Sequence, residues 1–393
     1  MTTTLSDAST PSASSREAWL RLAFVGLPAE RCNAALERFG TPRDLLDAAV
    51  AGHDAELLST RGITPTTVER LREAAARDLT RAYAAMETHG IRMLLTEDDD
   101  YPVALRGIPS PPPYLFIRGD VQERDEVAVA IVGTRGATEY GRGVAEKLAI
   151  ELAARGVTVV SGLARGIDTA AHRGALDAGG RTFAVCGCGL DIVYPSDNKK
   201  LMVDVQNGGA AFSEFAPTVH PESWHFPARN RIISGLSAGV IVVEAGERSG
   251  ALITADFAME QGRDVFAVPG NIHRVQSRGT HALIKQGATL VESADDVIGA
   301  LNNRALPFER SAPAAKSTTE KRKSAGRTFG ATPQRALPSL PRADLSPTEN
   351  RVYLALEVEA RHVDDIATAA QMGAAEANST LVLLELKGIA RRL

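Results

Sequence analysis

Between residues 127 and 301 the sequence alternates short apolar segments with helical ones, and this alternation limits the possible folds more than any other feature. The apolar segments show no polar–apolar alternation, so each strand must be buried on both faces. We expect six such strands, at Val127–Val132, Val157–Val160, Thr182–Val185, Gly239–Val243, Val265–Val268 and Ala288–Leu290. With helices between them, they predict an α/β fold with a doubly wound, mostly parallel sheet.

Helical segments flank this region. Residues 16–90 are rich in Ala and Leu, and Thr41-Pro42 and Thr64-Pro65 each place a capping residue before a proline at the first helical position. Residues 345–393 contain three short helical segments, which suit a helix-turn-helix or winged-helix module. Residues 91–120 are rich in turn signals and are expected to form a connector with one short strand at Tyr114–Ile117.

The chain therefore divides into five predicted parts. Residues 1–15 are a disordered lead without the apolar region of a secretory signal. Residues 16–90 form a small helical domain, of the sterile-alpha-motif or helix-hairpin-helix kind, and 91–301 form the α/β domain. Residues 302–344, rich in Pro, Ser, Lys and Arg, form a flexible basic linker. Residues 345–393 form the second helical module.

The charge of the chain is unevenly distributed. The net charge is -4, but residues 304–344 hold nine Lys or Arg against three acidic residues, which gives +6 there and about -10 elsewhere. Total charge therefore gives no general argument for nucleic-acid binding, and any such argument must rest on local groups.

Several classes of protein can be set aside. No apolar run reaches the roughly 18 residues that a membrane span requires. The three cysteines, Cys32, Cys186 and Cys188, are too few for a disulfide scaffold and fit a reducing cytoplasm. Cys186 and Cys188 are too close together for a zinc knuckle, so no metal site is expected. Motifs of nucleophilic catalysis and the P-loop lysine motif are absent, so we assign no catalytic residue and no cofactor.

Glycine-containing turns follow three of the predicted strands. They contain Gly133-Thr134-Arg135-Gly136, Ser161-Gly162-Leu163-Ala164-Arg165-Gly166, and Ser249-Gly250 with Thr254 close behind. A turn from a strand into a helix exposes backbone N–H groups to a phosphate at the positive end of the helix. The carboxyl ends of parallel strands are also where open α/β sheets bind ligands. We therefore predict a phosphate-binding site there, to which Arg135 adds a charge; the alternative is a tight turn with a surface arginine.

A second block combines cations with aromatic rings. Phe226 precedes Arg229-Asn230-Arg231 and follows Trp224 by two residues. Guanidinium groups that contact phosphate beside rings that stack on bases are typical of a groove for single-stranded nucleic acid. In the alternative, Arg229 or Arg231 pairs with a core carboxylate such as Glu244, and the rings are packing residues. Asp168 and His172 are interpreted as structural, the former as a helix cap.

Together these blocks resemble the DNA-processing protein A family (DprA, also called Smf). The matching stretches are Tyr101-Pro102 through Pro111-Pro112 to Gly119, Gly133-Thr134-Arg135 with Tyr140-Gly141, Ser161-Gly162 with Arg165-Gly166-Ile167-Asp168 and His172, Gly187-Cys188-Gly189-Leu190 with Tyr194-Pro195, Phe226-Pro227 with Arg229 to Ser234, Glu244-Ala245 with Ser249 to Thr254, and Val268-Pro269-Gly270.

The resemblance implies an extended Rossmann domain that binds single-stranded DNA, forms a homodimer, protects incoming DNA and helps load RecA during natural transformation. It places strand contacts on Gly133, Arg135, Ser161, Gly162, Phe226, Arg229, Asn230 and Ser249; the residue patterns above add Arg231 and Thr254. Family members often carry a C-terminal winged helix. Here the sequence ends directly after the presumed recognition helix, so we expect the wing to be truncated.

Two enzymatic alternatives remain. A nucleotide-processing enzyme, such as a phosphoribohydrolase on a related core, would use Glu244 beside Gly246 and Gly250. A dinucleotide oxidoreductase is less favoured, because Arg135 interrupts the G-x-G-x-x-G pattern where a pyrophosphate needs close backbone approach. Phosphate-friendly turns without an evident acid–base pair favour binding over turnover.

Overall fold

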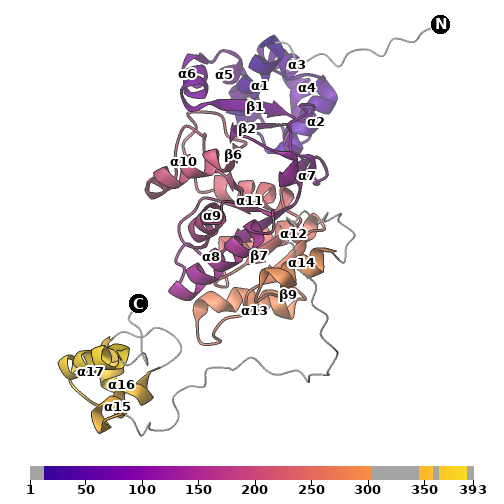
Figure 1. The fold of residues 1–393 in the computed structure, drawn as a ribbon. Helices are drawn as coiled ribbons and strands as arrows, with labels where there is room; N and C mark the ends of the chain where they lie inside the picture. Colours follow the sequence, from indigo (N-terminus) through magenta and orange to yellow (C-terminus); the bar gives the residue numbers. More distant parts are fainter. Residues whose placement is uncertain (1–12, 303–344, 357–362, 387–393) are drawn as a thin grey trace, which may run out of the picture. The chain divides into compact units, whose positions relative to one another are not determined.

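The computed structural model describes residues 13–302, 345–356 and 363–386, which belong to two compact units, 1–313 and 314–393 (Figure 1). The predicted lead lies outside the described residues up to residue 12, and the predicted basic linker lies outside them from residue 303. Each unit is described separately below.

The first unit contains a nine-stranded sheet with the order β1-β2-β6-β5-β4-β3-β7-β8-β9. The strands are β1 (Ile91–Leu95), β2 (Tyr114–Gly119), β3 (Ala128–Val132), β4 (Thr158–Ser161), β5 (Thr182–Val185), β6 (Gly209–Ser213), β7 (Gly239–Val242), β8 (Asp264–Ala267) and β9 (Thr289–Leu290). From β6 to β9 all neighbours pair in parallel, whereas β1 and β2 pair antiparallel at one end. This confirms the predicted α/β fold with a doubly wound, mostly parallel sheet.

Strands β1 and β6 differ from the sequence-based expectation. Residues 91–120 were expected to be a connector with one strand, and no strand was expected at 209–213. The β6 sequence, Gly-Ala-Ala-Phe-Ser, has no β-branched residue, so its local propensity for a strand is low. Its small residues instead allow the backbones of β6 and β5 to approach closely, since a Cβ on Gly209 would overlap the backbone of Thr182 in β5.

Helices cover both faces of the sheet. The connecting helices are α7 (Val103–Arg106), α8 (Glu139–Ala153), α9 (Ile167–Asp177), α10 (Lys199–Asn207), α11 (His225–Gly235), α12 (Gly250–Glu260), α13 (Arg278–Lys285) and α14 (Ala294–Asn302). Val129 and Ile131 of β3 share a core with α8, α9 and α14. Ala128 and Ala130, on the opposite face, share one with α11, α12 and α13. This double burial is the reason that the strands carry no polar alternation.

Six helices precede the sheet and pack beside β1 and β2 (Figure 1). They are α1 (Ala13–Val25), α2 (Ala29–Phe39), α3 (Pro42–Val50), α4 (Asp54–Leu58), α5 (Pro65–Ala75) and α6 (Thr80–His89). Thr41 and Thr64 accept hydrogen bonds from the N–H groups of Asp44 and Thr67, as N-caps of α3 and α5. Trp19 packs on Tyr114 of β2, with ring centroids 5.9 Å apart, so these helices share one core with the sheet.

The second unit contains three helices, α15 (Pro347–Ala355), α16 (Val363–Ala369) and α17 (Ala374–Leu386). Ser346 and Glu349 form a reciprocal capping box at the start of α15. Val352, Ile366 and Leu384 join the three helices in a small core. The predicted truncation of the wing concerns residues after 386, which lie outside the described part of the chain.

Two further findings concern the chain as a whole. Cys32, Cys186 and Cys188 are all buried free thiols. Within the described ranges, no helix has the length and apolar character needed to cross a membrane.

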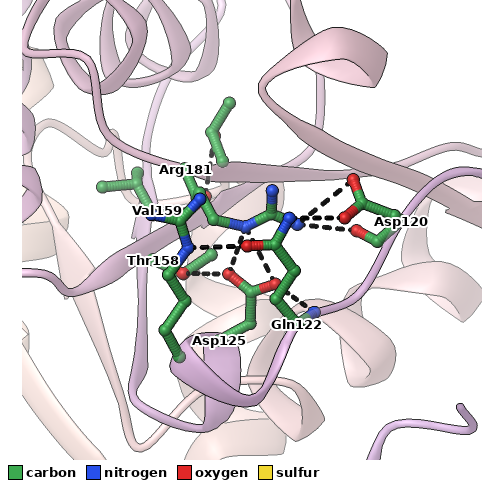
Figure 2. Close-up of polar contacts among 8 residues, drawn as sticks. Asp120, Gln122, Asp125, Thr158, Val159 and Arg181 are labelled. Atoms are coloured by element: carbon green, nitrogen blue, oxygen red, sulfur yellow. Dashed lines mark hydrogen bonds and ion pairs between the residues drawn. The ribbon is translucent and has the colours of Figure 1, made fainter.

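At the amino ends of β4 and β5 a buried ion pair joins three segments (Figure 2). The Nε of Arg181 donates to both carboxylate oxygens of Asp125, at 2.7 and 2.9 Å. The same carboxylate accepts from the hydroxyl of Thr158, at 2.6 Å, and from the backbone N–H of Gln122, at 2.8 Å. These hydrogen bonds satisfy both oxygens of the Asp125 carboxylate. The pair therefore ties the short helix η1 (Glu123–Glu126) to the sheet.

Asp125→Ala should lower the free energy of unfolding by about 3–5 kcal/mol, because it removes the buried carboxylate bonded to the Nε of Arg181 and leaves only the exposed Asp120 as a counter-charge. Asp120→Ala is the matched control: its carboxylate is 3.6 Å from Arg181 but its side chain is 53% exposed, so the loss should stay below about 1 kcal/mol. Urea denaturation followed by tryptophan fluorescence measures both, since both tryptophans belong to the first unit. Equal losses in the two variants would contradict the assignment.

Candidate nucleic-acid interface

A cavity of about 640 Å³ opens at the carboxyl ends of β3, β4 and β7. From β3 the chain continues through β4, β5 and β6 toward one edge of the sheet, and then through β7, β8 and β9 toward the other. The cavity thus lies at the point where the strand order reverses, which is the usual ligand position in open α/β sheets.

The walls of the cavity come from five segments. They are the turn after β3, the turn between β4 and α9 with the start of α9, the loop after β5 that holds Tyr194, the start of α11 with the loop before it, and the start of α12. Of the predicted site residues, seven line it: Gly133, Arg135, Phe226, Arg229, Asn230, Ser249 and Thr254. The three glycine-containing turns and the cationic block therefore meet at one place.

Arg135 presents an exposed cation to this cavity. Its guanidinium carbon lies 5.0 Å from the centroid of the Phe226 ring, and the Tyr194 ring lies 5.4 Å from the same ring. Within the described residues Arg135 forms no ion pair. A charge stacked on a ring, with a second ring alongside, combines a phosphate contact with a base-stacking surface.

Arg229 also lines the cavity, but it is part of the interior. It is 5% exposed, and it donates hydrogen bonds to the carbonyl oxygens of Gly162, at 2.9 Å, and of Val185. Burial lowers the pKa of Arg229 and raises the pKa of Asp168, and the charge of each residue opposes the shift of the other. Arg229 therefore braces the carboxyl ends of β4 and β5.

Gly162 and Ser161 serve the same interior. A Cβ on Gly162 would overlap the guanidinium of Arg229, so the glycine leaves room for the brace rather than for a ligand. Its N–H donates to the Asp168 carboxylate at 3.1 Å. The Ser161 hydroxyl is fully buried and donates to the carbonyl of Ile131 at 2.6 Å. Neither residue lines the cavity, contrary to the sequence-based expectation of a phosphate contact.

The predicted strand contact at Arg231 needs correction. Its guanidinium forms an ion pair with Glu214 and donates to the carbonyl of Ser110 at 2.6 Å, away from the cavity lining. On a helix, residues two apart point about 200° away from each other, so Arg229 and Arg231 cannot face one site. The pairing with a core carboxylate, the alternative to a DNA contact, is the arrangement that Arg231 adopts, with Glu214 in place of Glu244.

Glu244 holds Thr138, the N-cap residue of α8, and does not line the cavity. Its carboxylate accepts from the backbone N–H of Thr138, at 2.9 Å, and from the Thr138 hydroxyl, at the start of α8. Tyr194 and Glu222, in contrast, line the cavity without having been proposed as contacts. They lie in irregular segments whose course no local pattern indicates. Among the described residues, no group of three or more His, Cys, Asp or Glu could hold a metal ion.

Comparison with known proteins assigns the family. Residues 92–302 match the model of "DNA recombination-mediator protein A", and residues 336–393 match that of the "DprA winged helix domain". The chain belongs to the DprA/Smf family. The winged-helix match includes the three helices of the second unit, and it extends beyond the described residues.

Individual relatives support the assignment to this family. The DNA processing protein DprA of Streptococcus pneumoniae is 49% identical over 201 residues, which are 51% of this chain and 71% of that protein. An X-ray structure of the pneumococcal DprA covers 71% of this chain and 95% of its own, with 40% identity and a TM-score of 0.60. The structure of DprA from Helicobacter pylori, described for its unique single-stranded DNA binding mode, covers 55% of this chain and 96% of its own, with 31% identity and a TM-score of 0.49.

His172 supports the turn between β4 and α9, which forms part of the cavity wall. Its Nδ1 is 2.7 Å from the Thr182 hydroxyl, and its Nε2 accepts from the N–H of Leu163 at 3.3 Å. Leu163 has a φ of 57°, which a side chain rarely adopts without such support. His172 is fully buried, and burial, with the charge of Arg229, lowers its pKa to about 3. The neutral imidazole therefore serves as an acceptor, in line with the structural interpretation.

This histidine should make stability depend on pH. Because the pKa of His172 falls from 6.5 to about 3 on folding, the unfolded chain binds a proton in this window that the folded protein does not. Its contribution is complete above pH 6.5 and declines as the pH falls, by about 1.4 kcal/mol between pH 7.5 and 5.5. Urea titrations at the two pH values should show that His172→Gln loses this part of the decline. An identical decline in both proteins would refute the assignment.

Proposed function

We propose that this chain is a single-stranded DNA-binding protein whose cavity holds one stretch of the strand. The observation that carries the proposal is the exposed Arg135 guanidinium stacked on Phe226, with Tyr194 next to it. In this arrangement Arg135 contacts a phosphate and the rings stack on bases, which is a sequence-tolerant way of binding.

Backbone groups support the phosphate side of the site. The turn of Gly133 and Thr134 lies against the cavity, and Ser249 caps the start of α12, which also lines it, with Thr254 one turn further along. The amino end of an 11-residue helix carries partial positive charge and free N–H groups. A phosphate between these walls would meet Arg135 and the helix end together.

Membership of the family supports a proposal for the biological role. We propose that the protein acts in the cytoplasm, protects incoming single strands, promotes RecA loading in natural transformation and recombination, and functions as a homodimer. The family model's description as a recombination mediator supports the role in recombination. The buried free thiols of Cys32, Cys186 and Cys188 support the reducing compartment.

Arg135→Ala should weaken binding of single-stranded DNA about tenfold, the effect of losing one charged hydrogen bond. It should also reduce the magnitude of the salt slope by about 0.7, because one phosphate contact is lost. Arg61→Ala is the matched control, since its 86% exposed side chain lies among the N-terminal helices. Fluorescence anisotropy with a labelled oligothymidylate at several salt concentrations measures both. Equal affinities for the two variants would contradict the proposal.

We also propose that the protein binds without turnover. The enzymatic alternative rests on Glu244, and both oxygens of that carboxylate are bonded to Thr138 at the cap of α8. Incubation with nucleoside monophosphates should therefore release no free base, as measured by chromatography. Release that is abolished in Glu244→Gln would restore the phosphoribohydrolase reading.

A further inference from the structure

The two tryptophans of the chain have opposite environments. Trp19 is 9% exposed and packs on Tyr114 in the core, whereas Trp224 is 48% exposed directly before α11. Leaving half of an indole in water is unfavourable unless the exposed surface has a use, because its apolar area is large. Burial in the core therefore accounts for the position of Trp19 but not for that of Trp224.

Trp224 is held in a fixed orientation beside the cavity. Its indole N–H donates to the carboxylate of Glu222 at 2.6 Å, and Glu222 lines the cavity. The His225 ring lies 4.1 Å from the indole and the Phe215 ring 6.1 Å, both nearly perpendicular to it. No ring in the described residues is stacked in parallel on the indole.

The base of this arrangement is buried and closely packed. The His225 ring is buried and stacks on Phe215, with centroids 3.8 Å apart, and its Nδ1 lies 2.9 Å from the carbonyl oxygen of Gly187. The indole thus stands on a packed support and loses little side-chain entropy when a ligand stacks on it. Such preorganisation is the property that a stacking platform requires.

Continuity with the cavity indicates what the platform accepts. Phe226, two residues further along, stacks with Arg135 inside the cavity, and Glu222 links the indole to the cavity rim. We propose that Trp224 is a second stacking site, outside the cavity, for a nucleobase of the same DNA strand. This inference rests on the proposed function and extends the path of the strand beyond the cavity.

Glu222 acts in this proposal as a positioning residue. A carboxylate at the rim would repel DNA phosphates. Here the Glu222 carboxylate accepts a hydrogen bond from the indole N–H and so orients the ring. The strand would then pass with its phosphates toward Arg135 and its bases toward the aromatic side chains. Glu222→Gln keeps an acceptor and removes the repulsion, whereas Glu222→Ala releases the indole.

Tryptophan fluorescence tests the proposal in the full chain. In Trp19→Phe the emission comes from Trp224 alone, and oligothymidylate should quench it as the DNA binds. In case Trp19→Phe does not fold, Trp224→Phe in the wild-type background should lose the quenching. DNA binding measured independently by anisotropy without quenching would overturn the second site and leave the cavity proposal intact. Absence of binding by the unmodified chain would overturn both.

Affinity gives a second readout. Trp224→Leu should weaken binding of a long oligothymidylate about fivefold or more, the low end for loss of one stacked base. It should leave unchanged the binding of the shortest oligothymidylate that the cavity holds, and of a strand whose bases are replaced by abasic sites. Tyr83→Leu, at an equally exposed ring in α6, is the matched control and should bind like wild type.

The Glu222 variants separate orientation from charge. Glu222→Gln should retain the quenching and bind at least as tightly as wild type, whereas Glu222→Ala should bind like Trp224→Leu. A Trp224→Leu protein that binds every strand with wild-type affinity would overturn the proposal. So would a loss of affinity that is the same for the abasic strand, because the indole would then act through folding rather than through stacking.

Discussion

The buried guanidinium of Arg229 is the interaction on which the shape of the candidate site depends. The carbonyl groups at the ends of parallel strands need donors, and a single arginine supplies them to Gly162 after β4 and to Val185 of β5. Asp168 supplies the nearby negative charge and binds the N–H groups of the same turn. Charge, strand ends and turn are therefore one connected unit, and removing any member leaves a buried polar group unsatisfied.

The two ends of the sheet are organised by comparable means but for different purposes. At the amino ends, Asp125 and Arg181 satisfy each other in the interior. At the carboxyl ends, Arg229 satisfies backbone groups on the inner side, while the turns around it remain open to solvent. A buried ion pair that is complete stabilises a fold, whereas a buried cation that braces loops also keeps their outer N–H groups in place for a ligand.

The sequence predicts those strands well whose burial on both faces requires a continuous apolar segment. The central strands are apolar on both faces, so Val129 and Ile131 could be recognised without any tertiary information. Strand β6 could not, because Gly209 and its small neighbours are selected by contact with β5 rather than by local propensity. The turns and the cationic block could be recognised as motifs. The sequence did not indicate which of their residues point into the interior. Arg229 and Arg231 look equivalent in the sequence, and the helical repeat separates their directions without saying which one is buried.

This distribution of charge has a consequence for how such a site can bind DNA. Of the residues that line the cavity, Arg135 is the only exposed cation, since Arg229 is engaged inside, and Glu222 adds a negative charge at the rim. On a molecule that is net negative, one exposed guanidinium cannot supply the counterion release that dominates binding to extended basic surfaces. In the proposed function, affinity must then come largely from stacking on Phe226, Tyr194 and further rings along the strand. Such a mode of binding depends on unpaired bases, because a duplex keeps its bases stacked on each other, and it predicts a preference for single strands that does not come from charge.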